Sequence, residues 1–246
     1  MTIETTPART VAYGDDPAQV YDVLAPAAPR DTTVLVVHGG FWQADVDRAH
    51  TAEQVAGLAA AGYHVAVGEY RRWSATDQGW WRETLADVES LVRAVAADAG
   101  LPDRLVVMGH SAGGQLAAWA AGQPWIAECR VAGVVSLAGC VDLAVVDRLQ
   151  LGDDAARAFL GGGPDVVPEA WAAADPARAL PVVPVRLVSW DDDEEVPVEV
   201  SRSYAARFAT AEVTLDVIPG VAHFAYLDPT DPVWPHVLAT VESLLG

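Results

Sequence analysis

The chain has 246 residues, of which 52% are hydrophobic, and its 15 Lys and Arg against 34 Asp and Glu give a net charge of −19. This acidity argues against nucleic acid and anionic membranes as partners, because both are negatively charged. No apolar run approaches the roughly 18 residues of a membrane span, and the first nine residues lack the apolar stretch of a signal peptide, so we expect a cytoplasmic protein.

Strand and helix patterns alternate along the chain. Short apolar and β-branched runs predict strands at residues 10–13, 19–24, 34–37, 64–67, 105–108, 131–137, 185–189 and 213–217. Amphipathic runs bounded by Gly or Pro predict helices at residues 49–61, 80–99, 115–121, 198–209 and 232–245. This alternation predicts one α/β domain, with a mostly parallel sheet that carries helices on both faces.

Two features of the chain stand outside that alternation. Residues 140–180 have no strand character and predict only short helical pieces, which we interpret as a small cap inserted late in the domain. Cys129 and Cys140 lie away from any second Cys or His at metal-ligand spacing. We therefore expect two buried free thiols and no metal site.

A serine in a G-x-S-x-G pattern is the main chemical signal. The pattern reads Gly109-His110-Ser111-Ala112-Gly113, with an apolar strand before it and a helical run after it. Such a strand–elbow–helix unit exposes its serine in a strained turn, and the two glycines allow the strand and the helix to approach each other. The sequence therefore predicts Ser111 as a nucleophile.

A serine hydroxyl needs a base within hydrogen-bond reach and an acid that orients the base. Among the six histidines, His223 alone lies downstream of the elbow on a loop that follows a strand, so we predict it as the base. The acid is expected in the run of five acidic residues at 191–195, after the preceding strand, or at Asp142, after the strand before that.

An oxyanion needs preorganised N–H donors. The residue after the nucleophile, Ala112, supplies one, and the glycine pair that follows the strand at 34–37 supplies others. We predict Gly40 and Phe41 as these donors and expect Trp42 to contact the substrate. His38 is expected to brace the loop by hydrogen bonding.

Together these segments resemble the α/β-hydrolase superfamily, and within it the hormone-sensitive-lipase-like esterases and the serine-type kynurenine formamidases. The residues that carry the resemblance are HGGFW (38–42), GHSAGG (109–114), DDDEEVP (191–197) and PGVAHF (219–224). The resemblance implies an eight-stranded sheet. Its D-x-x-V-P pattern places the acid at Asp193, with Asp192 as the second choice.

We therefore expect an acyl-enzyme mechanism with Ser111, His223 and Asp193, without a cofactor. Two substrate classes remain open. The general fold favours a carboxylesterase for small esters, whereas the H-G-G-x-W match favours an aryl formamidase that cleaves an N-formyl group. The alternative from another class is a non-catalytic small-molecule-binding relative. Whether the chain forms a homodimer is left open.

Overall fold

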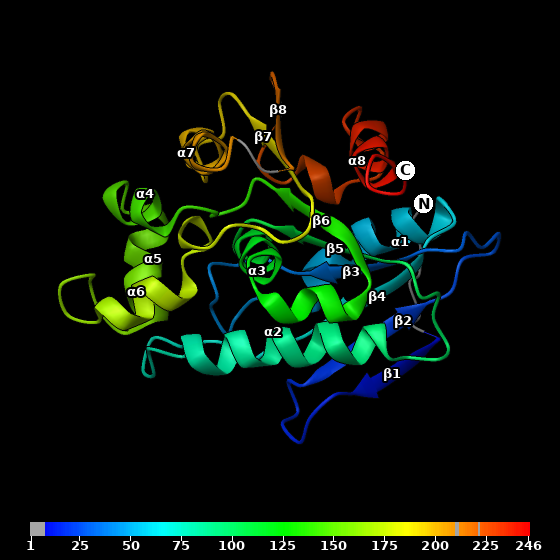
Figure 1. Ribbon diagram of the computed structural model, residues 1–246, viewed down its shortest axis with the longest axis horizontal. Helices are drawn as coiled ribbons and strands as arrows, with labels where there is room; N and C mark the ends of the chain where they lie inside the picture. Colours follow the sequence, from blue (N-terminus) through cyan, green and yellow to red (C-terminus); the bar gives the residue numbers. More distant parts are fainter. Residues whose placement is uncertain (1–7, 210–211, 221) are drawn as a thin grey trace.

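The computed structural model describes residues 8–209, 212–220 and 222–246. Its centre is an eight-stranded sheet in the order β1-β2-β4-β3-β5-β6-β7-β8 (Figure 1). The strands are β1 (Arg9–Ala12), β2 (Val20–Leu24), β3 (Thr33–Val37), β4 (His64–Gly68), β5 (Leu105–His110), β6 (Val131–Leu137), β7 (Val185–Trp190) and β8 (Val213–Ile218). Strands β3 to β8 are parallel, and β1 and β2 form an antiparallel edge. The predicted mostly parallel sheet is confirmed.

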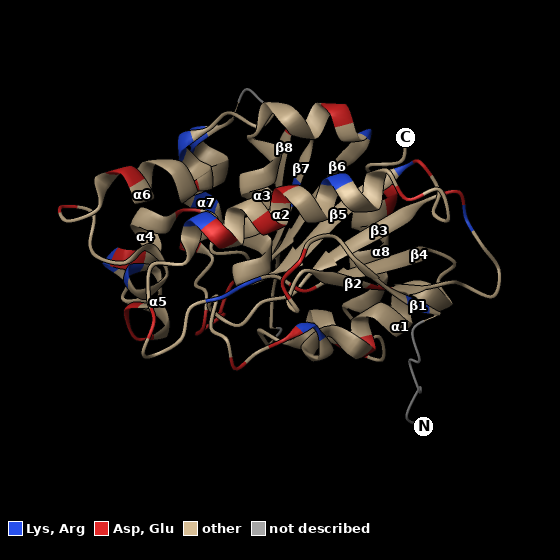
Figure 2. Ribbon diagram, turned by 90° about the horizontal axis from the view of Figure 1, so that it is seen from below, with Lys and Arg blue, Asp and Glu red and all other residues tan. Residues whose placement is uncertain are grey.

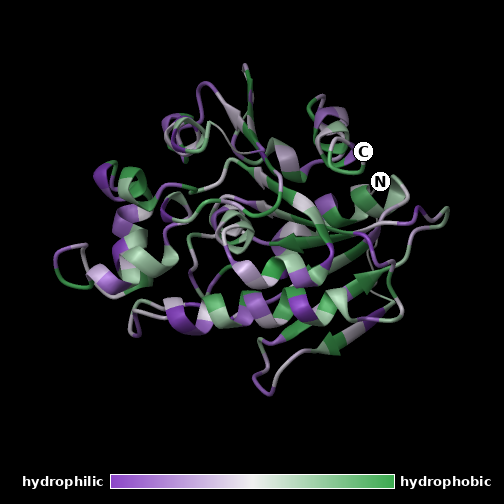
Figure 3. Ribbon diagram, viewed as in Figure 1, coloured by the Kyte–Doolittle hydropathy of each residue, from purple (hydrophilic) through white to green (hydrophobic). Residues whose placement is uncertain are grey.

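Helices cover both faces of the sheet (Figure 1). One face carries α2 (Trp81–Ala96), α3 (Ala112–Ala121) and α7 (Glu199–Arg207), and the other carries α1 (Ala52–Ala60) and α8 (Trp234–Glu242). The central strands are buried on both sides, because successive side chains of a strand point to opposite faces. In β3, for example, Leu35 joins one apolar cluster and Val36 joins the other. Figure 3 shows these apolar strands between helices of mixed hydropathy.

Residues 140–180 contain the three short helices α4 (Leu143–Arg148), α5 (Leu151–Leu160) and α6 (Pro168–Ala174) and the 3₁₀ turn η3 (Pro176–Arg178). They connect β6 to β7 and project to one side of the sheet, at the left of Figure 1. The remaining 3₁₀ turns are η1 (Arg48–Thr51), η2 (Pro124–Cys129) and η4 (Ala225–Leu227). The predicted short helical pieces are thus present.

Helix α3 begins three residues earlier than the sequence predicts, at Ala112 rather than Gln115. Its first turn includes two glycines, which are poor helix formers. The reason is packing against β3, because a Cβ atom on Gly113 would collide with the carbonyl oxygen of Val37. The glycine pair thus lets the helix start directly beneath a neighbouring strand.

Figure 2 shows acidic residues on several helices and loops. Cys129 and Cys140 are buried and free, as predicted. Over the described ranges, no helix has both the length and the apolar character that crossing a bilayer requires.

Candidate active site

Ser111 lies at the turn between β5 and α3. Its backbone has φ 55° and ψ −120°, a conformation with positive φ that residues with a side chain rarely adopt. The Ser111 amide donates to the carbonyl of Leu137 over 2.9 Å, which ties the turn to the neighbouring strand β6. A Cβ on Gly109 would collide with the carbonyl of Gly113, so the elbow requires glycine there. Backbone strain of this kind is typical of functional sites.

His223 and Asp193 form a buried pair. Nδ1 of His223 lies 2.7 Å from Oδ2 of Asp193, and the two residues are 7% and 5% exposed. The other carboxylate oxygen of Asp193 accepts from the amides of Glu195 and Val196, each over 2.9 Å. These two amides fix the carboxylate, so Asp193 can hold both the tautomer and the orientation of the imidazole.

The other two acid candidates lie elsewhere. Asp192 is exposed. Asp142 is buried, but its oxygens accept from the Val145 amide over 3.2 Å and from Oγ of Ser203 over 2.6 Å, so it caps α4. Of the three carboxylates considered from the sequence, the structure brings Asp193 alone to His223.

His110, the residue before Ser111, holds the loop that carries His223 (the histidine loop) against the turn between β5 and α3. Its Nε2 lies 2.9 Å from the carbonyl oxygen of His223, and the two imidazole rings are 4.6 Å apart. Burial, reinforced by the nearby His223, keeps the pKa of His110 well below its usual value. The ring is therefore neutral and carries its one proton on Nε2, where it donates to that carbonyl.

His223 is thus held against His110, the residue before Ser111, and no hydrogen bond joins Ser111 Oγ to His223 within the part of the chain that the structure describes. Such contacts are often long in an empty enzyme and tighten when substrate binds.

The loop after β3 passes directly beside the serine. A Cβ atom on Gly39 would lie 3.1 Å from Cβ of Ser111. The next three residues, Gly40, Phe41 and Trp42, all have positive φ, at 101°, 47° and 58°. Two of the three carry side chains, so the conformation must be stabilised by its surroundings.

That stabilisation comes from the carbonyl groups of the loop. The carbonyl of Gly39 accepts from Nδ1 of His38 over 2.8 Å, and that of Gly40 accepts from the Gln43 amide over 2.9 Å. The carbonyl of Phe41 accepts from Nε1 of Trp73 over 3.0 Å. The prediction that His38 braces this loop is thereby confirmed.

Fixing a carbonyl also fixes the amide that follows it. In a planar trans peptide the C=O and the next N–H point in opposite directions. The N–H groups of Gly40 and Phe41 therefore point away from His38 and Gln43, and neither has a hydrogen-bond acceptor among the described residues. Ala112 occupies the first helical position of α3, where the amide has no acceptor within its own helix. Among the described residues none of these three amides has a backbone acceptor outside its own element, and their role as oxyanion donors stays a prediction.

The prediction for Trp42 is wrong in this structure. Its side chain is 0% exposed, stacks on Phe159 at 4.7 Å between ring centroids, and donates through Nε1 to Oε1 of Gln115 over 2.9 Å. A substrate in an open site would not touch it. Trp42 instead joins the loop after β3 (residues 38–43) to α5 and α3. Burying this large aromatic ring is favourable for stability, and the buried ring has no surface left for a ligand.

Trp190 lies at the end of β7, directly before the loop that carries Asp193 (residues 191–197, the acid loop). It is fully buried and stacks on Tyr226 at 3.3 Å between ring centroids. The hydroxyl of Tyr226 donates to the carbonyl of Val188 over 2.9 Å. Trp190 therefore packs between β7 and η4 and leaves the opening beside His223 clear.

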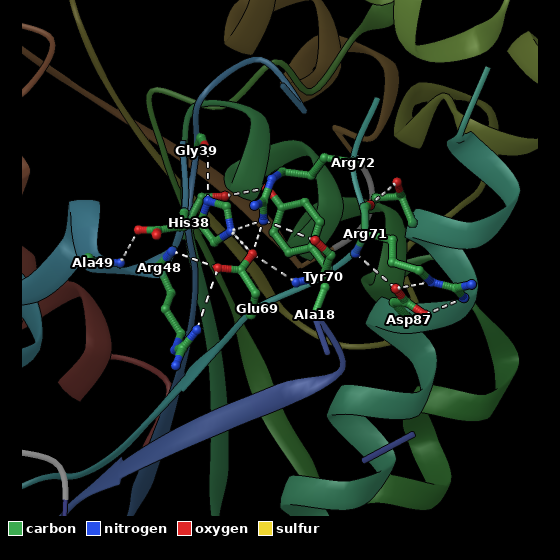
Figure 4. Close-up of polar contacts among 12 residues, drawn as sticks. Ala18, His38, Gly39, Arg48, Ala49, Glu69, Tyr70, Arg71, Arg72 and Asp87 are labelled. Carbon is green, nitrogen blue, oxygen red and sulfur yellow. Dashed lines mark hydrogen bonds and ion pairs between the residues drawn. The ribbon is translucent and has the colours of Figure 1, made fainter. Parts of the chain in front are cut away.

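Glu69 is a further buried residue near this loop, and no sequence prediction named it. This residue directly follows β4 and is 4% exposed, and its carboxylate contacts His38, Arg48 and Arg72 (Figure 4). An acidic residue at the end of a continuous apolar strand was the available signal, since buried carboxylates are rare unless they are paired.

A cavity of about 430 Å³ opens beside His223. Its walls come from the acid loop and the histidine loop, with the lining residues Asp192, Asp193, Glu194, Glu195, Gly220, Ala222, His223 and Phe224. The Phe224 ring is 53% exposed at its edge. Across the described ranges, no group of three or more His, Cys, Asp or Glu side chains is arranged to hold a metal ion.

The chain is similar to a known protein family and to solved structures. The model of the BD-FAE family matches residues 21–208. A truncated carbohydrate esterase from gut microbiota superposes with a TM-score of 0.81 and 19% identity, covering 99% of both chains.

Two further solved structures are similar. Thermogutta terrifontis esterase 2 gives a TM-score of 0.75 with 20% identity, over 99% of this chain and 95% of that one. Esterase B from Lactobacillus rhamnosis gives 0.76 with 20% identity, over 98% and 89%. Similarity at this level of identity establishes the fold, and the expected α/β-hydrolase fold is confirmed.

Proposed function

The chain belongs to the BD-FAE family, and on that basis and on the geometry of Ser111, His223 and Asp193 we propose that it is a serine hydrolase that cleaves small esters through an acyl-enzyme. The observation that carries the proposal is the buried Asp193–His223 pair held against a strained serine elbow. Three amides without an acceptor lie at the same elbow.

In the proposed reaction, Ser111 Oγ attacks the ester carbonyl while Nε2 of His223 takes its proton. Asp193 stabilises the resulting imidazolium through Nδ1. The amides of Gly40, Phe41 and Ala112 bind the oxyanion of the tetrahedral intermediate. His223 then protonates the leaving alcohol, and in the second half-reaction it activates a water molecule that releases the acid and regenerates Ser111.

The charge beside His223 favours an uncharged substrate, although the cavity there is lined by neither Ser111 nor the three amides. Asp192, Glu194 and Glu195 are exposed at its wall, and its lining contains no Arg or Lys. Carboxylates of one sign repel an anionic ligand that approaches within a Debye length. The exposed ring of Phe224 offers an apolar surface at the same opening.

An aryl formamide is the second candidate, favoured by the H-G-G-x-W segment at residues 38–42. The burial of Trp42 removes direct contact of that tryptophan with the substrate as a reason for choosing it. We therefore rank the ester first. A binding protein without catalysis is the third alternative, and it gives no covalent chemistry at Ser111.

The test compares a short-chain nitrophenyl ester with N-formylkynurenine, and uses a fluorophosphonate probe to label the nucleophile. We expect turnover of the ester, labelling of the wild-type chain, and loss of both in Ser111→Ala, which should fold normally. Faster turnover of N-formylkynurenine than of the ester would place the aryl formamide first and the ester second. Absence of labelling in a folded wild-type chain would refute the proposal and favour the binding protein.

A further inference from the structure

We call residues 38–43, which follow β3, the oxyanion loop. Behind it lies a buried charged cluster centred on Glu69 (Figure 4). One carboxylate oxygen, Oε1, forms an ion pair with Nη1 of Arg72 and accepts from the Tyr70 amide over 3.1 Å. The other, Oε2, accepts from the amide of Arg48 over 3.0 Å. The carboxylate thus connects the end of β4 with the segment that precedes α1.

His38 is the part of this cluster that touches the loop. It is 0% exposed, stacks on Tyr70 at 4.4 Å between ring centroids, and has a contact at both ring nitrogens. Nδ1 lies 2.8 Å from the Gly39 carbonyl, whereas Nε2 lies 2.9 Å from Oε1 of Glu69 and 3.1 Å from Nη1 of Arg72. The ring is therefore held by Glu69 and Arg72 on one side and by the loop on the other.

Protonation follows from these contacts. Burial, together with the guanidinium of Arg72, lowers the pKa of His38, so the neutral ring is favoured. A neutral imidazole has one N–H, and both of its neighbours, the Gly39 carbonyl and the Glu69 carboxylate, can only accept. Oε1 of Glu69 already has Arg72 and the Tyr70 amide as donors, whereas Nδ1 is the donor that the structure offers the Gly39 carbonyl, so we place the proton on Nδ1. Nε2 is then an acceptor, and Arg72, which Glu69 holds in place, donates to it.

His38 affects the site through the Gly39–Gly40 peptide group. The Nδ1–H of His38 fixes the Gly39 carbonyl, and the planar peptide directs the Gly40 amide the opposite way. If the ring rotated or changed tautomer, the Gly39 carbonyl would lose its donor, and the Gly40 amide could turn from the oxyanion position.

We propose that Glu69 is a positioning residue of the oxyanion loop, which acts through Arg72 and His38 on the Gly39–Gly40 peptide and thereby sets the direction of the Gly40 N–H. The inference rests on the proposed function for its kinetic consequence. Its structural part, the orientation of one peptide, is independent of any activity.

The chain provides a matched control. Asp87 is also a buried carboxylate, 1% exposed, and it pairs with a neighbouring arginine, since its oxygens lie 2.9 Å and 2.7 Å from Nε and Nη2 of Arg71 (Figure 4). It contacts neither His38 nor the oxyanion loop in the described structure. Replacing it disturbs a similar ion pair without disturbing the peptide at Gly39.

Two substitutions of Glu69 distinguish the effect of side-chain length from the effect of the negative charge. Glu69→Gln keeps the length of the side chain and an oxygen for Arg72 but removes the charge. Glu69→Asp keeps the charge but withdraws the carboxylate by one methylene. Positioning depends on reach, so we expect kcat to fall about 30-fold in Glu69→Asp, a large part of the effect of losing one oxyanion donor, and less than fivefold in Glu69→Gln. KM should change less than threefold in both.

Stability should rank the other way, because Glu69→Gln leaves Arg48 and Arg72 beside an uncharged partner. Asp87→Asn should lower stability while leaving kcat within twofold of wild type. A purely structural role for Glu69 predicts that kcat follows stability through all three variants, and that result would overturn the proposal.

A spectroscopic measurement decides the structural part. In protein labelled with ¹⁵N-glycine, the amide resonances of Gly39 and Gly40 should shift in Glu69→Asp and stay in place in Asp87→Asn. Unchanged resonances in Glu69→Asp would refute the positioning role even in an active enzyme. Absence of Ser111-dependent turnover in the wild type would instead refute the proposed function, and the glycine spectra would still answer the question for Glu69.

Discussion

Two histidines follow strands of this sheet, and each lies against a buried carboxylate. Nδ1 of His223 is 2.7 Å from Asp193, and Nε2 of His38 is 2.9 Å from Glu69. In their surroundings the two pairs differ. His223 lies at the edge of a cavity with its Nε2 unengaged by Asp193, whereas His38 is fully enclosed and has contacts at both nitrogens.

The comparison shows that a histidine–carboxylate pair does not by itself indicate a catalytic base. A base needs one nitrogen available to the reacting group, and the carboxylate must hold the other. The pair at His223 meets this condition, whereas both nitrogens of His38 are occupied, Nδ1 by the Gly39 carbonyl and Nε2 by the side chains of Glu69 and Arg72. The availability of a ring nitrogen, rather than the pairing, is therefore our reason for proposing His223 as the base.

The largest test of this comparison replaces each histidine. We expect His223→Ala to lower kcat for a short ester by about 10⁴-fold or more, because it removes the base. His38→Asn should cost only about 30-fold, as expected for Glu69→Asp, since it disturbs one oxyanion donor and leaves the base in place. Steady-state kinetics on both variants measures this, and equal losses would contradict the assignment.

The next test concerns the carboxylates. Asp193→Asn should lower kcat by about 10³-fold to 10⁴-fold, because an amide at this position would favour the wrong tautomer of His223. Asp192→Asn provides the matched control, since this neighbour is exposed and makes no contact with His223. If the neighbour caused the larger loss, the acid would have to be reassigned.

The smallest effect appears in stability against pH. The pKa of His38 is lowered from 6.5 to about 3, chiefly by burial. Between these values the unfolded chain binds a proton that the folded chain excludes, so stability falls as the pH is lowered.

Removing this group in His38→Asn should flatten the fall by about 1.4 kcal/mol per pH unit between pH 6 and pH 4. Urea unfolding of the wild type and the variant at several pH values measures the slope. Identical slopes would mean that His38 titrates alike in both states, and the enclosed pair would then resemble an ordinary surface histidine.

Much of this molecule can be predicted from patterns along the chain. Continuous apolar runs predicted the parallel strands, and a serine and a histidine that directly follow strands predicted the residues that the sheet brings to one edge. Asp193 required the D-x-x-V-P resemblance, because a run of five acids does not show which one turns inward. That choice depends on the amides of Glu195 and Val196, which capture its carboxylate.

Trp42 and Glu69 could not be assigned in this way. Trp42 is buried because Phe159 and Gln115 approach it from helices far along the chain. Glu69 is important because Arg48, Arg72 and His38 converge on it from separate segments. Both roles depend on tertiary contacts, which the periodicity of apolar residues along the chain does not predict.

The order of the strands has a consequence for the protein during synthesis. The proposed nucleophile follows β5, whereas the proposed base follows β8, the strand at the far edge of the sheet. A nascent chain that has emerged only as far as α7 already carries Ser111 and Asp193 but lacks His223. The proposed triad would thus stay incomplete during synthesis until the segment after β8 has emerged from the ribosome.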